Sequence, residues 1–318
     1  MKILLSCPPM LGQVDLFRPI FEQHGLELIC PNFVQTLSED ELCALLPDMD
    51  GWIIGDDPAT YRVLEAGKKG KLKAVVKWGV GVDNVDFDAC KTLGLPVSNT
   101  PGMFGEEVAD VALGYIIGLA RETFTIDQGV RQGAWPKPAG MSLTGKKLGL
   151  IGFGDIGQAI AKRCRAFGLD LTIWDPYAKP SDQDISNYAF KSFPAGMEEV
   201  DFLVASCALT PETKYMVDTK VLNLAPKGLK VVNVSRGGII KEKDLVEALA
   251  SGQVSAAGLD VFEEEPLPMD APIRAFEQCI FGTHNGSNTV DAVIRASHQA
   301  MRLLFGFLHV EIKEAAFK

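Results

Sequence analysis

Three apolar runs of the chain are each followed by a side chain that could move a proton or bind a small anion. Arg236 follows one apolar run and precedes two glycines, and the acidic residues Glu263–Glu265 follow another. His284 lies in a short polar loop directly after the apolar segment 279–281. An imidazole exchanges protons near neutral pH, a carboxylate orients it and stabilises its charged form, and a guanidinium can hold a carboxylate with two hydrogen bonds. Together these residue types predict acid–base chemistry on a small acidic molecule.

Each of these residues also has a purely structural interpretation. Arg236 could form an ion pair, the acidic run could be a solvated loop, and a loop histidine often only completes a turn. The other histidines are weaker candidates, since His24 lies in a predicted surface helix and His298 and His309 lie in the last helical pattern. Because ligands bind in loops that follow the strands of an α/β sheet, His284 is the favoured proton donor.

A glycine-rich turn predicts a dinucleotide site. The apolar run Leu148–Ile151 leads into Gly152, Gly154 and Gly157 with the spacing G-x-G-x-x-G, and an amphipathic segment follows. The first glycine permits a tight turn, the second lets the backbone approach a pyrophosphate, and the third lets the helix pack closely on the strand. The alternative is an ordinary turn from a strand into a helix.

The residues around this turn indicate which dinucleotide is bound. The backbone amides of Asp155 and Ile156 would begin a helix, where partial positive charge favours phosphate. Asp175 ends the next apolar run, and a carboxylate there accepts hydrogen bonds from ribose hydroxyls and repels a 2′-phosphate. No arginine follows it, and Lys179 is the only nearby cation in the sequence. The expected cofactor is therefore NAD, although Asp175 could also belong to a simple Asp-Pro turn.

Composition limits the class of protein and its partners. The chain has 318 residues, enough for two domains, and a net charge of −10, which opposes binding to nucleic acid or an anionic membrane. No apolar run reaches the roughly 20 residues that a membrane span needs. Seven scattered cysteines without a C-x-x-C pair predict neither disulfides nor a metal site and fit a reducing compartment. Since the N-terminus resembles a strand rather than a signal peptide, we expect a cytoplasmic protein.

Short apolar runs alternate with helical patterns, which is typical of parallel sheets covered by helices. In the first hundred residues we expect strands at 2–6, 27–30, 51–54, 72–77 and 96–98. A second series of expected strands begins at residue 148 and comprises 148–151, 170–174, 202–205, 230–233 and 256–260. Long helices are expected at 106–121 and about 289–308, and Ser38 is a possible N-cap.

Two α/β units in one chain predict a cleft between them. The glycine turn lies in the second unit, so the first hundred residues are left to bind or shape the substrate site. Turn residues near positions 101 and 286 mark the boundaries, and the last helix is expected to return to the first unit. We therefore predict one domain at 1–99 with 288–318 and another at 100–287.

Several motifs follow one another in the order found in one enzyme family. They are the segment 77–86 (KWGVGVDNVD), the turn 99–102 with 107–110, the glycine turn, and the segments 209–213, 233–238 and 259–266. With these motifs the chain resembles the D-isomer-specific 2-hydroxyacid dehydrogenase family, in particular its D-3-phosphoglycerate dehydrogenase-like branch. The resemblance covers nearly the full length.

The resemblance implies a fold, a reaction and a catalytic set. The fold would be two Rossmann-like domains with doubly wound parallel sheets, a flavodoxin-like substrate-binding domain and an NAD-binding domain, and the chain would form a homodimer through the long helix after residue 101. The reaction would be reversible hydride transfer between NAD(H) and C2 of a small 2-hydroxy or 2-oxo acid. Arg236, Glu265 and His284 would be catalytic, with Glu265 selected because the family's glutamate immediately precedes the proline.

The resemblance also suggests binding residues. Substrate contacts are expected from Lys77, Val80, Gly81 and Arg236. Besides the glycine turn and Asp175, cofactor contacts are expected from Val234, Ser235, Asp260, Gly286 and Ser287. Lys77 could instead be merely solvated. Trp78, Phe104 and Trp135 could also line the substrate pocket.

The chain departs from the family pattern at some positions. Thr283 stands where a proline usually precedes the histidine, and Lys77 and Trp78 replace the arginine and small residue common in the phosphoglycerate branch. Because the chain ends at Lys318, regulatory domains and feedback control by an amino acid are not expected. The alternatives are an NADPH-dependent glyoxylate or hydroxypyruvate reductase and a non-catalytic, NAD-sensing binding protein of the same fold. Formate dehydrogenases are disfavoured, since a glutamine would be expected at position 265.

Overall fold

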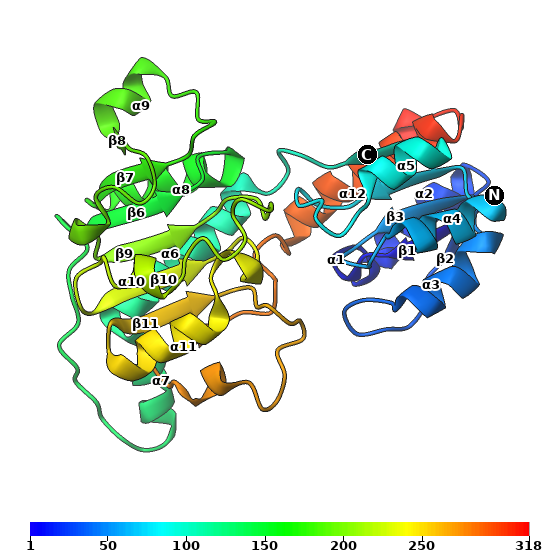
Figure 1. Cartoon of the computed structure of the whole chain (residues 1–318). Helices are drawn as coiled ribbons and strands as arrows, with labels where there is room; N and C mark the ends of the chain where they lie inside the picture. Colours follow the sequence, from blue (N-terminus) through cyan, green and yellow to red (C-terminus); the bar gives the residue numbers. More distant parts are fainter. Residues whose placement is uncertain (318) are drawn as a thin grey trace. The chain divides into compact units, whose positions relative to one another are not determined.

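The structure, a computed structural model, describes residues 1–317 and contains two α/β units (Figure 1). The first unit comprises Met1–Met103 and Asn288–Lys318, and the second comprises Phe104–Ser287. In both units the strands are parallel and helices cover the two faces of the sheet. The predicted fold class, α/β with two Rossmann-like domains, is therefore confirmed.

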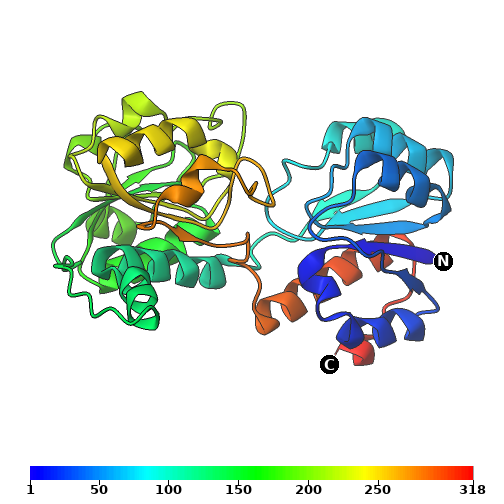
Figure 2. The same cartoon turned by 90° about the horizontal axis from the view of Figure 1, so that it is seen from below.

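The first unit is built on a five-stranded sheet with the order β2-β1-β3-β4-β5, the flavodoxin-like order. Its strands are β1 Lys2–Ser6, β2 Glu27–Ile29, β3 Gly51–Ile54, β4 Ala74–Lys77 and β5 Val97–Asn99. On one face lie α3 Glu39–Leu45, α4 Tyr61–Lys69 and α5 Phe87–Leu93, and on the other α1 Pro8–Leu11, α2 Val14–Gln23 and α12 Val290–Phe307 (Figure 2). Both faces of β3 and β4 are buried, which explains why apolar residues follow one another in these strands up to Lys77, the last residue of β4.

Local sequence signals fix where these helices begin. Ser38 caps α3 in a capping box with Glu41, as its position in the sequence predicts. Thr289 caps α12 through its hydroxyl, which accepts a hydrogen bond from the amide of Ala292. The buried residues of α12 recur every three or four positions, so one face of the helix packs on β3 and β4.

The second unit is built on a seven-stranded sheet with the order β12-β11-β10-β9-β6-β7-β8. Its strands are β6 Lys147–Ile151, β7 Asp170–Trp174, β8 Ala189–Phe190, β9 Phe202–Ala205, β10 Leu229–Asn233, β11 Val254–Leu259 and β12 Ile280–Phe281. Counted from β6, this is the Rossmann order with a seventh strand added at one edge. The order reverses between β6 and β9, the point where such sheets bind ligands.

Helices α6 Gly105–Arg121 and α8 Asp155–Ala166 pack on each other against one face of this sheet. Helix α11 Glu242–Ser251 and the short α10 Thr219–Leu222 lie on the other face, while α9 Asp182–Asn187 precedes β8. The two-residue strands β8 and β12 were not predicted, because so short a segment shows no periodicity.

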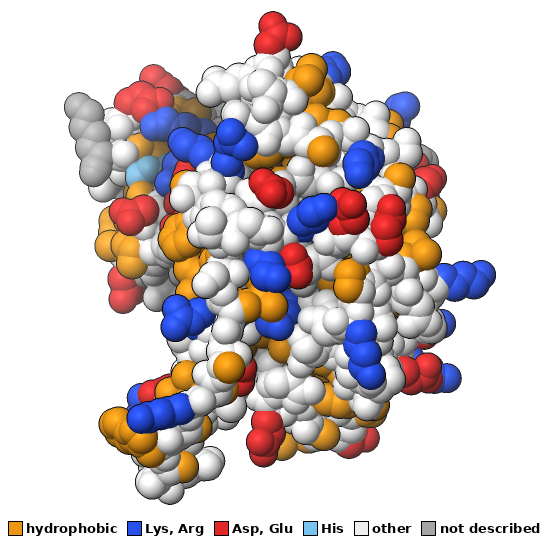
Figure 3. Space-filling view, turned by 90° about the vertical axis from the view of Figure 1, so that its left-hand side faces the viewer, with side chains coloured by type: hydrophobic (Ala, Val, Ile, Leu, Met, Phe, Trp, Pro, Cys, Tyr) orange, Lys and Arg blue, Asp and Glu red, His pale blue; other side chains and the backbone are white. Residues whose placement is uncertain are grey.

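Helix α7, Thr123–Arg131, has no buried residue. Phe124, Val130 and the nearby Trp135 are all exposed, and Trp135 keeps 76% of its surface accessible. The lower projection in Figure 3 displays hydrophobic side chains on its surface. Within residues 1–317, no helix has both the length and the apolar character that crossing a membrane requires.

Candidate active site

Three neighbouring strands of the second unit place the predicted catalytic residues at the same edge of its sheet. Arg236 follows β10, Glu265 lies in the loop after β11, and His284 follows β12. These strands are parallel and adjacent, in the order β12-β11-β10. Because the carboxyl ends of parallel strands meet at one edge, residues 48 positions apart in sequence can lie within hydrogen-bonding distance.

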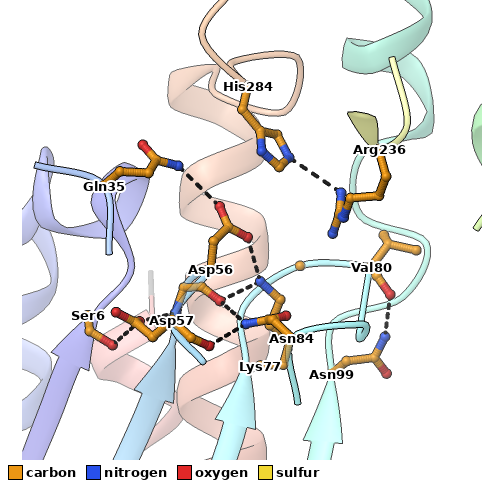
Figure 4. A network of polar contacts seen from close by, with 12 residues as sticks. Ser6, Gln35, Asp56, Asp57, Lys77, Val80, Asn84, Asn99, Arg236 and His284 are labelled. Carbon is orange, nitrogen blue, oxygen red and sulfur yellow. Dashed lines mark hydrogen bonds and ion pairs between the residues drawn. The ribbon is translucent and has the colours of Figure 1, made fainter. Parts of the chain in front are cut away.

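The three side chains are in contact. The Nδ1 atom of His284 lies 2.7 Å from Oε2 of Glu265. Its Nε2 atom lies 3.4 Å from Nη1 of Arg236 (Figure 4). A guanidinium can only donate a hydrogen bond, so in this arrangement Nε2 is the acceptor. Nδ1 then carries the ring proton and donates a hydrogen bond to Glu265. Both the histidine and the glutamate keep about a fifth of their side-chain surface accessible. The pair is therefore partly accessible to a molecule from solvent.

The loop that carries His284 is held in an unusual conformation. His284 has φ = 55°, in the left-handed region that side chains other than glycine seldom adopt. Its amide donates to the carbonyl of Asp260 at 2.6 Å. The buried carboxylate of Asp260 accepts hydrogen bonds from the amides of Asn285 and Gly286, at 3.2 and 2.8 Å. Such strain persists where the surroundings over-determine it, which is common at functional sites.

Asp260 therefore positions the loop that carries His284. Its predicted contact with the cofactor stays a prediction. The hydroxyl of Tyr115, from α6, also donates to this carboxylate at 3.4 Å. Burial, and then the charge of Asp260, raise the pKa of Tyr115, so the phenol keeps its proton and can act as a donor. Sequence reasoning did not identify Tyr115, because the helix that carries it is 145 residues away.

The turn that presents Arg236 depends on Asn233 and Gly237. The side chain of Asn233 donates to the carbonyl of Arg236 at 2.9 Å and accepts from both the amide and the hydroxyl of Ser235. A Cβ atom at Gly237 would overlap the backbone of Phe262, so the loops after β10 and β11 touch here. The amide of Phe262 in turn donates to Oε1 of Glu265 at 2.9 Å. Asn233 was not singled out, although an asparagine that ends a strand is a recognisable turn signal.

The glycine turn after β6 has the geometry of a pyrophosphate site. Gly152 has φ = 95°, and a Cβ atom there would lie 2.8 Å from the amide nitrogen of Cys207. A Cβ atom at Gly157 would overlap the carbonyl oxygen of Gly152. By contrast, Gly154 has ordinary φ and would meet no protein atom within 4 Å, so neither strain nor packing requires a glycine there. Helix α8 begins at Asp155 without a side-chain cap, so space and amide donors remain for phosphate.

Asp175, after β7, lies beside this turn. Its carboxylate accepts hydrogen bonds from the amide of Phe153, at 2.7 Å, and from that of Tyr177, at 2.8 Å. Both bonds hold the carboxylate next to the loop after β6 and leave further lone pairs for ribose hydroxyls. The residues around the glycine turn therefore fit NAD.

In the first unit, the segment after β4 contains the predicted substrate residues. The amide of Gly79, which has φ = 135°, donates to the hydroxyl of Thr100 at 2.8 Å, and the carbonyl of Val80 accepts from Asn99 at 3.0 Å. Val80 is exposed and Gly81 half-buried. The alternative of a merely solvated Lys77 does not hold, since only 2% of this residue is accessible, and its predicted substrate contact stays a prediction. Its ammonium group bonds to Gly55 and Asp56, which makes it part of the structure of this edge.

The remaining sequence candidates make contacts of their own or differ in exposure. His24 bonds through both ring nitrogens, to Ile20 and to the amide of Lys313, and His298 lies on α12. Trp78 and Phe104 are buried, whereas Trp135 is exposed. Within residues 1–317 we find no group of three or more histidine, cysteine, aspartate or glutamate side chains able to hold a metal ion.

Comparisons with known proteins agree with this geometry. Residues 113–286 match the model of the "D-isomer specific 2-hydroxyacid dehydrogenase, NAD binding domain". A hydroxypyruvate reductase of Thermotoga maritima is 35% identical over 275 residues, which are 85% of this chain and 88% of that protein. A D-3-phosphoglycerate dehydrogenase of Methanocaldococcus jannaschii is 35% identical over 80% of this chain, which spans only about half (49%) of that relative.

The solved structures include a NAD-dependent formate dehydrogenase of Staphylococcus aureus in complex with NAD. It is 27% identical, covers 98% of this chain and 97% of its own, and has a TM-score of 0.85. The matching domain model, the glycine turn and the acid at its side all identify NAD as the cofactor. The chain thus belongs to the D-isomer specific 2-hydroxyacid dehydrogenase family and is an NAD-dependent oxidoreductase.

Proposed function

We propose that Arg236, Glu265 and His284 catalyse reversible hydride transfer between NAD(H) and C2 of a small 2-hydroxy or 2-oxo acid. The observation that carries this proposal is the 2.7 Å contact of His284 with Glu265, which fixes the ring so that Nε2 faces Arg236. Bound NADH supplies the hydride for reduction. Family membership makes the reaction type plain, while the roles of individual residues are our assignment.

His284 handles the proton. In reduction, the protonated ring gives the Nε2 proton to the oxygen on C2 as negative charge develops there, and in oxidation Nε2 takes it back. Glu265 stabilises the charged ring through Nδ1 and prevents it from turning. Arg236, a donor only, would bind the substrate carboxylate or the reacting oxygen and stabilise its developing charge.

We assign the other binding roles from position. Backbone amides at Val80 and Gly81 are proposed to bind the substrate carboxylate, with Lys77 beside them. The glycine turn, with Asp155 and Ile156, is proposed to hold the pyrophosphate, and Asp175 the ribose. Val234, Ser235, Asp260, Gly286 and Ser287 are the remaining proposed cofactor contacts, in loops at the same sheet edge.

Two measurements test the function. The first is a screen of NADH oxidation with pyruvate, glyoxylate, hydroxypyruvate, phosphohydroxypyruvate, oxaloacetate and branched 2-oxo acids. We expect turnover of at least one small 2-oxo acid, and a lack of turnover with all of them would favour a binding protein that only senses NAD. The second compares kcat/KM for NADH and NADPH with the same substrate. Asp175 predicts a clear preference for NADH, and a preference for NADPH would instead favour the reductase alternative.

We further propose a homodimer through α6 and α7. Exposed apolar residues can mark interaction sites, and Phe124, Val130 and Trp135 are exposed on or shortly after α7, the helix that packs against α6. The double variant Val130→Glu/Trp135→Glu should elute as a monomer in light-scattering chromatography. Tyr177→Glu, a matched change at another exposed aromatic residue, should keep the wild-type mass. A monomeric wild type would contradict this assembly.

The cysteines support a reducing compartment, which we propose is the cytoplasm. All seven are free thiols. Burial raises the pKa of Cys207 and Cys279 to about 11 in each case, which keeps both thiols protonated and unreactive.

A further inference from the structure

Helix α6 supplies a polar side chain, that of Tyr115, to the edge of the sheet where the proposed catalytic loops lie. The helix packs on β10, β11 and β12, the strands that precede Arg236, Glu265 and His284. The helix, the strands and the loops all belong to the second unit. Tyr115 is therefore part of the same compact unit as the loops whose positions determine the proposed chemistry.

Two glycines make room for the side chain of Tyr115. A Cβ atom at Gly258, in β11, would lie 2.8 Å from the Cβ atom of the tyrosine. A Cβ atom at Gly282, just after β12, would overlap the tyrosine hydroxyl itself. Neither glycine has a positive φ, so the close approach of the tyrosine, rather than backbone conformation, accounts for them. The hydroxyl thus occupies the space that a side chain at position 282 would need, two residues before His284.

The hydroxyl of Tyr115 donates to a buried carboxylate. Its oxygen lies 3.4 Å from Oδ1 of Asp260, a residue that is only 3% accessible. Among the described residues, the other donors to this carboxylate are the amides of Asn285 and Gly286. All three donors are uncharged groups. Because hydrogen bonds replace the hydration that a carboxylate loses on burial, each of these donors matters to the position of Asp260.

Asp260 in turn holds the loop that carries His284. Its carbonyl accepts from the amide of His284, and its carboxylate accepts from the next two amides, those of Asn285 and Gly286. The left-handed backbone of His284 persists only where its surroundings hold it. Oδ1 of Asp260 accepts from both Tyr115 and Asn285, so the helix and the loop share one oxygen atom.

We infer that Tyr115 is a positioning residue for proton transfer: its hydroxyl fixes the carboxylate of Asp260, which fixes the loop that carries His284. The effect on catalysis rests on the proposed function, whereas the effect on the loop can be measured without turnover. Burial, and then the charge of Asp260, raise the pKa of the phenol, so it remains a donor throughout the neutral pH range. Tyr115 acts through Asp260 and does not itself give a proton to the substrate.

The test removes the hydroxyl and keeps the ring. Tyr115→Phe leaves the ring on Gly258 and takes away only the donor to Asp260, so the fold should be preserved. Tyr61→Phe, the same change at an exposed tyrosine of the first unit, is the matched control. Circular dichroism and melting curves establish that each variant is folded.

Amide hydrogen exchange measures the hold on the loop in protein that has no substrate. In Tyr115→Phe the amides of Asn285 and Gly286 should exchange about tenfold faster, which is roughly the effect of losing one hydrogen bond to a charged group. The amides of β10 and β11 should exchange as in the wild type, because the ring still packs on the sheet. Tyr61→Phe should leave the exchange of the loop unchanged.

Steady-state kinetics measures the consequence for the reaction. With a 2-oxo acid that the wild type reduces, kcat of Tyr115→Phe should fall about tenfold, because the ring of His284 is less firmly held. A double-mutant cycle with Asp260→Ala tests the route. Once the carboxylate is absent, the hydroxyl has nothing to fix, so adding Tyr115→Phe should change kcat by no more than about twofold. A tyrosine that only packed the helix would cost the same in both backgrounds.

The outcomes separate the role of Tyr115 from the function beneath it. Wild-type kcat and wild-type loop exchange in Tyr115→Phe would overturn the inference and leave the dehydrogenase intact. An equal loss of kcat with and without Asp260 would overturn it as well. If Asp260→Ala does not fold, exchange at Asn285 and Gly286 together with kcat of Tyr115→Phe decides the question. If the wild type reduces no 2-oxo acid, the proposed function fails, while the exchange measurement still decides whether Tyr115 holds the loop.

Discussion

His284 is the residue on which the proposed chemistry depends, and its backbone is as informative as its side chain. A left-handed conformation is tolerated there because Asp260 binds the loop through its carbonyl and its carboxylate. The ring is then fixed by Glu265 on one nitrogen. Asp260 thus sets the position of the loop and Glu265 sets the tautomer of the ring. Together they hold the basic nitrogen in one orientation.

Replacing His284 should remove proton transfer. We expect His284→Ala to lower kcat by about two to four orders of magnitude, the usual contribution of a general acid or base. His309→Ala is a matched control, because His309 has the same φ of 55° but is exposed and outside the candidate site. Steady-state kinetics of both folded variants decides the matter, and near-wild-type turnover by His284→Ala would remove the residue from this role.

Glu265 should act through the charge of the ring. In Glu265→Gln the side chain can keep its bond to the amide of Phe262 but no longer stabilises the imidazolium form. In the proposed mechanism reduction requires the protonated ring, so activity is lost as pH rises, and the midpoint of kcat/KM should move to lower pH. Glu264→Gln, an exposed neighbour, should leave the profile in place. An unshifted profile in Glu265→Gln would reduce this residue to a structural contact.

The site follows from a pattern of neighbouring strands. β10, β11 and β12 each contribute one member of the set, and the loops after β10 and β11 meet at Gly237. The predicted strands are confirmed with shifts of one or two residues at their ends, since strands buried on both faces still stand out as short apolar runs between turn signals. No short stretch of sequence shows which strands pair with each other, because neighbouring strands come from distant parts of the chain.

The contact at Gly237 can be tested with a neighbouring glycine as the control. Gly237→Ala should destabilise the fold by about 3 kcal/mol, because its Cβ atom would overlap the backbone of Phe262, which cannot rotate away. Gly238→Ala should be tolerated, because its nearest neighbours are flexible side-chain atoms of Leu209 at 3.4 Å. Thermal or urea unfolding gives the comparison. Equal stability of the two variants would show that the loops after β10 and β11 do not touch as described.

Over the whole molecule, the first unit is assembled from both ends of the chain. Helix α12 packs on β3 and β4, and its Ser297 accepts a hydrogen bond from Trp78 at 3.1 Å across 219 positions of sequence. His298, on the same helix, lies edge-on to the rings of Phe17 and Phe317. Burial, and then the charge of Arg302, lower the pKa of this histidine below its usual 6.5.

The pH dependence of stability should report on this packing. Because the folded state holds His298 neutral, its contribution is fully present above pH 6.5 and is lost as pH falls through the lower pKa of the folded state. Between pH 7.5 and 5 the Tm of the wild type should therefore fall more steeply than that of His298→Gln, which cannot titrate. His309→Gln, at an exposed position, should follow the wild type. Parallel curves for wild type and His298→Gln would contradict a depressed pKa.

The sequence by itself determined the glycine turn, the acid after the next strand and the order of family motifs, because these features depend on residue types at short, fixed spacings. From them followed the fold class, NAD and the type of reaction. Of the acidic run, Glu265 was selected by resemblance rather than by spacing. Local signals could go no further, since they contain no information on which loops meet.

Only the tertiary structure decided which groups touch. It brought Tyr115 and Asp260 together over 145 positions, gave Asn233 its role in the turn of Arg236, and showed Lys77 to be buried under Asp56. The physical reason is that hydrogen bonds and charge pairs act over a few ångströms. Distance in the folded chain, rather than separation in sequence, therefore decides which polar groups are paired and buried.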